Sequence, residues 1–296
     1  MTVTNDSLRD RALRVPAFRK ASCGACLTRR LWAHPDNEGR RLRRLMAALA
    51  FEARSRALGH RRIVTLGSAS RLWATTRHYA SVVVLHGNPP DWNEMLAWRR
   101  HLRPGNLFVD VGANIGLYTL WVAECGAEVI SVEPDADALR ALHENLSLND
   151  YDVTVLPIAL GARPGEFRMT RGLDVLNHLV MAEKGEPGHG RLSQTVAVET
   201  LDDVLGERTA DGVKIDVEGA ERFVLEGAER SLADHRIRLL QIEWNDMSER
   251  LLGEDRRPVA ELLRRHGYRL RRPDRAGALH PVDDLGFGPD VFATPT

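Results

Sequence analysis

The segment LFVDVGANIGLYTL, residues 107–120, constrains the fold more than any other part of this sequence. An apolar run reaches Asp110, a turn follows with glycines at 112 and 116, and a helical pattern begins directly after Gly116. This order predicts a strand, a tight turn and a helix, which is the opening unit of an α/β nucleotide-binding sheet. Gly112 and Gly116 allow the backbone to approach a ligand closely, and the free N–H groups at the helix start point into the same crevice.

Strands and helices alternate from residue 106 onward. The predicted strands after the first are Glu128–Val132, Val153–Leu156, Gly212–Val217, Arg238–Trp244, Tyr268–Leu270 and Val291–Ala293, and the helices are Asp135–Leu148, Ala220–Leu232 and Glu254–His266. Two short strands are expected near Glu166–Met169 and Thr195–Val198. The pattern predicts an α/β fold with a seven-stranded, mostly parallel, doubly wound sheet.

The N-terminal residues 1–60 are expected to form a partly helical extension. The pair Cys23 and Cys26 is half of a zinc site at most, and two thiols in a flexible segment is the simpler interpretation. A helix is predicted over Glu38–Leu58, with an apolar stripe expected to pack on its own domain. The stripe consists of Leu42, Leu45, Met46, Leu49 and Ala53. A membrane surface or a calmodulin-like partner is the alternative for such a basic amphipathic helix.

Residues 61–296 are expected to form the main domain, with residues 61–105 as a lead-in hairpin and helix. The hairpin strands are predicted at Arg62–Leu66 and Tyr79–Leu85, and the helix runs to Leu102. Asp91 is its expected N-cap, with Glu94 at the capping-box position.

Composition narrows the protein class. The chain is 43% hydrophobic and 28% charged with zero formal net charge, which is typical of a globular protein and gives no argument for nucleic acid or an anionic membrane. Three cysteines do not make a disulfide framework, and no signal peptide or long apolar span is recognisable. We therefore expect a cytoplasmic protein without stable membrane insertion, and the sequence does not predict its oligomeric state.

Two cofactor classes compete for the turn after Asp110. The spacing Gly112-Ala-Asn-Ile-Gly116 departs from the G-x-G-x-x-G pattern of dinucleotide sites, and a carboxylate at position 110 repels a phosphate. S-adenosylmethionine carries no phosphate and has two cationic groups that such a carboxylate favours. Glu133, at the tip of the second strand, is placed to accept hydrogen bonds from ribose hydroxyls. The residues favour S-adenosylmethionine over NAD.

Five blocks of this sequence resemble the FkbM-type methyltransferases. They are FVDVGANIG from Phe108, VEP from Val132, LPIALG from Leu156, TLDD from Thr200 and KIDVEGAE from Lys214. The resemblance implies a class I methyltransferase fold and methyl transfer from S-adenosylmethionine, usually to a hydroxyl of a sugar or natural product such as a secondary metabolite or glycolipid. It also implies that the methionine end is lined by Asp110, Gly112, Ala113, Asn114 and Gly116, that Glu133 holds the ribose, and that Ala159 lies beside the adenine.

Asp216 and Glu218 lie at the carboxyl end of the fourth strand, outside which open α/β sheets bind substrate. Paired carboxylates can orient a hydroxyl, take its proton or hold a divalent cation, although a metal site is not predicted here. Alternatively, Glu218 can cap the next helix. Glu243, at the end of the fifth strand, and His178, in a long loop over 170–194, are further candidates for the base. That loop is either a lid or acceptor pocket, or a disordered insertion.

The expected partner is a small-molecule acceptor. Two other functions stay open: methyl transfer to nitrogen, although the Asn/Asp-Pro-Pro-Tyr motif is missing after the fourth strand, and cofactor binding without turnover.

Overall fold

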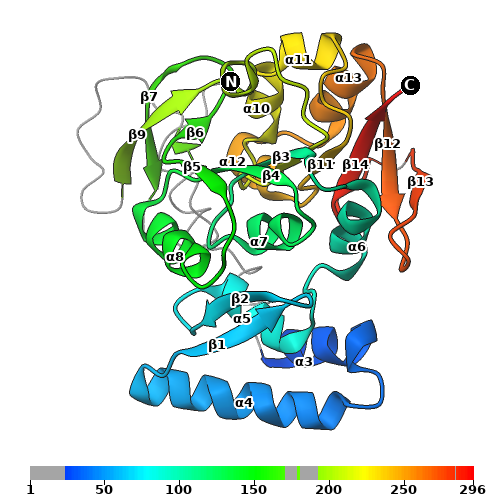
Figure 1. Cartoon of the computed structure of the whole chain (residues 1–296). Coiled ribbons are helices and arrows are strands. Elements are labelled where there is room, and N and C mark those ends of the chain that lie inside the picture. Colours follow the sequence, from blue (N-terminus) through cyan, green and yellow to red (C-terminus); the bar gives the residue numbers. More distant parts are fainter. Residues whose placement is uncertain (1–23, 171–178, 181–192, 284) are drawn as a thin grey trace.

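An eight-stranded sheet forms the centre of the computed structural model, which describes residues 24–170, 179–180, 193–283 and 285–296 (Figure 1). Its strands lie in the order β13-β12-β14-β11-β10-β3-β4-β5. Their bounds are β3 Leu107–Val111, β4 Glu128–Val132, β5 Val153–Leu156, β10 Gly212–Ile215, β11 Leu240–Ile242, β12 Tyr268–Pro273, β13 Leu279–Pro281 and β14 Val291–Pro295. Strands β11, β10, β3, β4 and β5 are parallel, and β14, β12 and β13 add antiparallel pairs. The predicted α/β fold and mostly parallel sheet are confirmed, and the short β13 extends the sheet beyond the seven strands expected.

Helices cover both faces of this sheet (Figure 1). They are α6 Trp92–His101, α7 Leu117–Ala123, α8 Ala136–Leu146, α9 Leu201–Leu205, α10 Glu221–Glu226, α11 Glu229–Ala233, α12 Met247–Leu252 and α13 Arg257–Arg265. Alternate residues of β3 face opposite cores: Val109 packs in the cluster that contains Val224 of α10, and Phe108 packs in the cluster that contains Trp98 of α6. Burial on both faces explains why β3 is apolar at nearly every position.

Two helices differ from the sequence prediction in this part of the chain. The helix expected at Ala220–Leu232 is divided into α10 and α11 around Gly227. A Cβ at Gly227 would lie 2.1 Å from the carbonyl oxygen of Gly161, so the two backbones are in direct contact there. Helix α12 was not predicted.

A smaller sheet lies beside the carboxyl ends of the central strands. It contains β6 Ala159–Leu160, β7 Gly165–Thr170, β8 Leu179–Val180 and β9 Ser193–Glu199, in the order β6-β9-β7-β8. The two short strands expected from the sequence form as β7 and β9 and pair antiparallel.

The N-terminal part forms a separate layer on one side of the central sheet (Figure 1). It consists of α3 Gly24–Ala33, the 3-10 turn Pro35–Asn37, α4 Arg41–Leu58, the hairpin of β1 Arg62–Leu66 and β2 Ser70–Ala74, and α5 Tyr79–His86. A small core joins these elements through Leu31, Phe51, Ala74 and Leu85.

The strand predicted at Tyr79–Leu85 is wrong, because this segment forms helix α5 and the hairpin partner of β1 is β2. A short run such as YASVVVL does not distinguish a strand from a helix that is buried on most sides. Leu85 packs in the N-terminal core, whereas Tyr79 and Val83 line the cavity described below. Tertiary packing overrides the β propensity of the three valines.

Helix α4 forms within the predicted range and ends at Leu58 as expected; Leu45 of the predicted stripe packs on the N-terminal core, but most of the stripe faces solvent. Leu42, Met46 and Leu49 are 66%, 60% and 52% exposed, and Ala48 and Phe51 are buried instead. The expectation that the stripe packs on its own domain is therefore wrong for these three residues. None of the helices that the structure describes has the length and apolar character needed to cross a bilayer.

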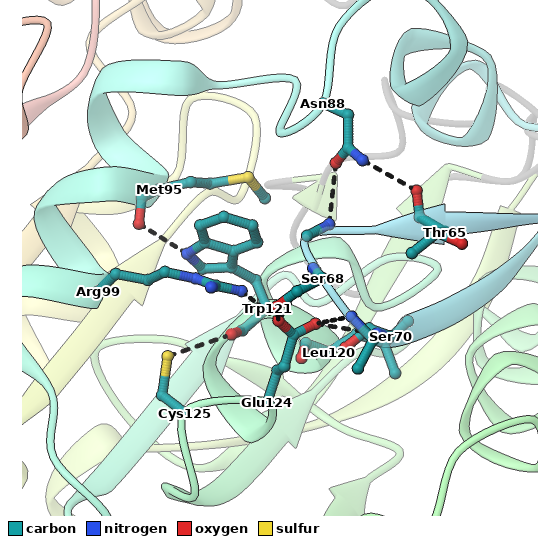
Figure 2. Close-up of polar contacts among 12 residues, drawn as sticks. Thr65, Ser68, Ser70, Asn88, Met95, Arg99, Leu120, Trp121, Glu124 and Cys125 are labelled. Atoms are coloured by element: carbon teal, nitrogen blue, oxygen red, sulfur yellow. Dashed lines mark hydrogen bonds and ion pairs between the residues drawn. The ribbon is translucent and has the colours of Figure 1, made fainter. Parts of the chain in front are cut away.

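One carboxylate anchors the hairpin to the central domain. Glu124, directly after α7, accepts hydrogen bonds from the backbone N–H groups of Ser68 (3.1 Å), Ala69 (3.1 Å) and Ser70 (2.9 Å), and it pairs with the guanidinium of Arg99 (Figure 2). We call this set of contacts the Glu124 joint.

Asn88 reinforces the joint from the other side of the hairpin turn. Its Oδ1 accepts from the Gly67 N–H at 2.9 Å, and its Nδ2 donates to the Thr65 carbonyl at 3.1 Å (Figure 2). The hairpin turn is thereby held in place by both α7 and the segment that precedes α6.

Candidate active site

A cavity of about 300 Å³ lies at the carboxyl ends of β3, β4 and β10. Its lining includes most of the residues predicted for the site: Asp110, Gly112, Ala113, Asn114, Glu133, Ala159, Asp216 and Glu218. Gly116 is not among the lining residues, and His178 lies outside the described residues. The structure thus brings together residues from the carboxyl ends of three strands and from the start of β6, although they are spread from Asp110 to Glu218 in the sequence.

The glycine turn fits the site because of close backbone approach. Gly112 has φ +79°, and a Cβ there would lie 1.9 Å from the carbonyl oxygen of Asp216. The N–H groups of Gly112 and Ala113 donate to the Val132 carbonyl at 2.9 and 3.1 Å, which fixes the turn to β4. Only glycine meets both the left-handed backbone and the contact with β10.

Gly116 has a packing role in the described structure. It has φ +90° at the start of α7, and a Cβ would lie 2.5 Å from Cδ1 of Leu142 on α8. Because Gly116 has no side chain, α7 and α8 can pack closely next to the cavity, although Gly116 does not line it.

Asp110 is fully buried and has one unsatisfied oxygen. Its Oδ2 accepts from the Thr119 hydroxyl at 2.7 Å, whereas Oδ1 has no hydrogen-bond partner among the described residues. Burial raises the pKa of Asp110, and the nearby Lys214 and the Thr119 hydrogen bond oppose that rise. A buried acceptor on a cavity wall without a donor is a place where a ligand donor or cation is stabilised.

Glu133 is 7% exposed and is held by the backbone. Oε2 accepts from the Asn114 N–H and Oε1 from the Asp135 N–H, both at 2.8 Å. Burial raises the pKa of Glu133 to about 7, although both hydrogen bonds lower it. Each oxygen retains a second lone pair, so the carboxylate is oriented and still able to accept from a ligand hydroxyl.

Three carboxylates meet at the ends of β10 and β11. Ligand oxygens of Asp216, Glu218 and Glu243 lie within 4.8 Å of one another, and all three residues line the cavity. Glu218 has φ +53°, an unusual backbone for a residue with a side chain. Burial raises the pKa values of Glu218 and Glu243. The negative charge of Asp216 raises both pKa values further, and Glu218 also raises the pKa of Glu243.

The alternative helix-capping role of Glu218 belongs to a different residue. No side-chain cap is present at Ala220, the N-cap of α10, and the N–H of Gly219 donates to Oε1 of Glu221 at 2.9 Å. The Oε2 of Glu221 in turn forms a fully buried ion pair with Arg256 at 2.8 Å. Glu218 is therefore left at the cavity.

Lys214 also lines the cavity, next to the carboxylates, although it was not among the predicted site residues. Its Nζ lies 2.8 Å from Oδ2 of Asp216 and 4.7 Å from the ring centre of Tyr118, and the side chain is 4% exposed. The available signal was a lysine inside an otherwise apolar strand, two residues before Asp216 and therefore on the same face. A buried lysine requires a carboxylate partner.

The N-terminal layer supplies a part of the site that no sequence signal indicated. Arg30 and Tyr79 line the cavity, and Arg30 pairs with Asp91 at 2.7 Å. The carboxylate of Asp91 also accepts from the Tyr118 hydroxyl at 3.3 Å and makes no capping hydrogen bond to α6. Asp91 is thus the N-cap residue of α6 as predicted, but its side chain does not cap the helix, because the carboxylate pairs with Arg30 and Tyr118 instead.

The sequence matches the methyltransferase FkbM domain over residues 110–270. The 31-O-demethyl-FK506 methyltransferase FkbM of Streptomyces tacrolimicus is 33% identical over 199 residues, which are 56% of this chain and 74% of that protein. Methyltransferase sdnD of Sordaria araneosa is 32% identical over 160 residues, 43% of this chain and 62% of that protein. The AMB antimetabolite synthetase AmbE of Pseudomonas aeruginosa is 28% identical over 207 residues, which are 57% of this chain but only 10% of that protein.

The matched domain contains the glycine turn, Glu133 and the carboxylates of β10 and β11, so it includes the central part of the cavity. It also covers more than half of the 296 residues. The chain belongs to the FkbM methyltransferase family.

Proposed function

We propose that this chain is an S-adenosylmethionine-dependent O-methyltransferase that acts on a hydroxyl of a sugar or natural product. The observation that carries the proposal is that one cavity is lined both by Asp110 and Glu133 and by the carboxylates that follow β10 and β11, which are Asp216, Glu218 and Glu243. One relative is named as a methyltransferase of an O-demethylated natural product, which agrees with an oxygen acceptor.

The residues present fit the cofactor. The unpartnered Oδ1 of Asp110 suits a cationic or N–H donor group, and the oriented carboxylate of Glu133 suits ribose hydroxyls. Ile158, Ala159 and Leu160 give the wall beyond Glu133 an apolar surface suited to a flat base. S-adenosylmethionine, when bound, supplies a methyl group that its sulfonium has already activated.

The chain itself has to align the acceptor oxygen, exclude water and receive a proton. Asp216 and Glu218 are positioned to orient the hydroxyl and accept this proton, with Asp216 held in place by Lys214. Arg30 and Tyr79 cover the cavity from the N-terminal layer, which gives that layer a role in acceptor binding.

The test combines binding and transfer on the same preparations. Calorimetry with S-adenosylhomocysteine should show binding to the wild type and a roughly tenfold or greater loss for Glu133→Gln, because a charge-assisted hydrogen bond is removed. Glu128→Gln, at the other end of β4 and exposed, is the matched control and should bind like the wild type. Transfer of tritiated methyl groups to a panel of sugar and polyketide acceptors then tests the chemistry.

Normal binding by Glu133→Gln would refute the assignment of the cofactor site. Tight binding without transfer to any acceptor would instead favour a cofactor-binding module without turnover.

A further inference from the structure

The three carboxylates at the ends of β10 and β11 carry more negative charge than their surroundings compensate. Lys214 contacts the group, and its single charge is paired with Asp216 at 2.8 Å. One carboxylate oxygen each of Asp216, Glu218 and Glu243 lies within 4.8 Å of the other two, and no second cationic side chain forms an ion pair with them among the described residues. Like charges this close in a partly dehydrated cavity are unfavourable unless a proton or a cation lies between them.

A second observation points to a ligand at this place. Glu243 uses Oε1 to accept from the side-chain amide of Asn245, whereas Oε2 has less than 1 Å² of accessible surface and no hydrogen-bond partner among the described residues. A carboxylate oxygen that is buried and unpartnered loses its hydration without replacement. A cation between the three side chains would satisfy this oxygen.

The spacing agrees with a small divalent cation. Oxygen ligands of octahedral Mg²⁺ at about 2.1 Å from the metal lie roughly 3–4.2 Å from one another. The separations here reach at most 4.8 Å, so small side-chain rotations are enough to bring three oxygens into one coordination sphere. Carboxylates without histidine or cysteine favour a hard cation of the Mg²⁺ type over Zn²⁺.

We propose that Asp216, Glu218 and Glu243 form a binding site for one divalent cation of the Mg²⁺ type, in the part of the cavity where the acceptor hydroxyl is proposed to bind. This inference deepens the proposed function and rests on it in one respect: a cation here would contact the acceptor hydroxyl and lower the cost of removing its proton. Asp216 can contact both Lys214 and the cation, since its Oδ2 pairs with Lys214 and its Oδ1 remains for the metal.

The test measures metal binding directly, without any acceptor. The full-length protein is treated with a chelator, desalted and titrated with Mn²⁺, and the free ion is followed by electron paramagnetic resonance. We expect one saturable Mn²⁺ site per chain from which Mg²⁺ displaces the ion. Glu243→Gln and Glu218→Gln should each weaken Mn²⁺ binding by roughly 10–100-fold. Glu249→Gln, an exposed carboxylate on the nearby α12, should leave it unchanged.

Thermal unfolding of the same proteins provides a second readout. Mn²⁺ should raise the midpoint of the wild type and of Glu249→Gln, because a ligand of the folded state stabilises it. It should not raise the midpoint of Glu243→Gln, whose metal-free form should be at least as stable as the wild type because one repelling charge is gone. This result separates loss of a ligand from misfolding.

Absence of saturable Mn²⁺ binding to the wild type overturns the proposal, as does binding that neither glutamine variant weakens. Cofactor binding and methyl transfer are scored separately on these preparations. Mn²⁺ binding that depends on Glu243, in a protein that methylates no acceptor, would refute the proposed function and still support the cation site.

Discussion

The Glu124 joint gives a prediction whose size follows from the contacts in Figure 2. Burial raises the pKa of Glu124, but hydrogen bonds from Ser68 and Ser70 and the Arg99 ion pair outweigh it and lower the pKa from 4.5 to about 2. At 1.36 kcal/mol per unit this corresponds to roughly 3 kcal/mol between the charged and the protonated carboxyl. The joint lies at the edge of the domain, where solvent screens part of the interaction, so we expect about 1.5–2 kcal/mol.

Glu124→Gln removes the charge and places an amide N–H₂ against backbone N–H donors. We therefore expect the free energy of unfolding to fall by about 2 kcal/mol at pH 7, measured by urea unfolding followed by tryptophan fluorescence. The folded-state pKa is depressed, so this stabilisation is present above about pH 4.5 and is lost as the pH falls toward about 2. The difference between wild type and variant should shrink across that window.

The matched control is Glu144→Gln, which removes an exposed ion pair with Arg61. It should change the free energy of unfolding by less than about 0.5 kcal/mol. If Glu124→Gln costs no more than this control, or if its cost is constant from pH 7 down to about pH 3, the electrostatic account of the joint fails.

Three further outcomes follow from the site. Gly112→Ala should abolish binding of S-adenosylhomocysteine and lower the free energy of unfolding by about 2–4 kcal/mol, because its Cβ would overlap the Asp216 carbonyl. The control Gly105→Ala has the same backbone strain (φ +80°), but a Cβ there has nothing within 4 Å. It should lower the free energy of unfolding in urea by only about 1 kcal/mol. Calorimetry should show that affinity for S-adenosylhomocysteine rises as the pH passes about 7, since only the charged Glu133 accepts from both ribose hydroxyls; a flat profile would argue against ribose binding there. Arg30→Ala should raise the KM for an acceptor without changing cofactor affinity, and equal effects on both would place Arg30 elsewhere.

The middle of the central sheet was predictable because β3, β4, β10 and β11 are buried on both faces. Segments such as Leu107–Val111 and Glu128–Val132 have the mostly apolar pattern that this burial requires, and the glycine turn fixes how the first strand meets its helix. The same rule fails for Tyr79–Leu85, since a helix buried on several sides has an identical pattern. Helix α4 shows the complementary limit: periodicity identified the helix, but its buried face is centred on Ala48 and Phe51, and of the predicted leucines only Leu45 packs against it.

The candidate site was predictable for residues whose position depends only on the strand that carries them. Asp110, Glu133 and Asp216 line the cavity because each lies near the carboxyl end of a parallel strand or directly after it. Lys214 had a local signal in its place inside an apolar strand two residues before Asp216, and the structure adds that it lies beside Asp110 in the register of β10 and β3. Arg30 reaches the cavity from the N-terminal layer, and this placement is set by tertiary packing, which sequence spacing does not encode.

Helix α5 contacts both the cavity and the N-terminal core. Tyr79 and Val83 form part of the cavity wall, whereas Leu85, on the other side of the same helix, is locked into the N-terminal core with Phe51. A change of side-chain volume at Leu85 or Phe51 shifts the whole helix, since packed interiors do not absorb added atoms locally. The shape of the proposed acceptor pocket can thus be retuned by substitutions at Leu85 or Phe51, which do not line the cavity themselves.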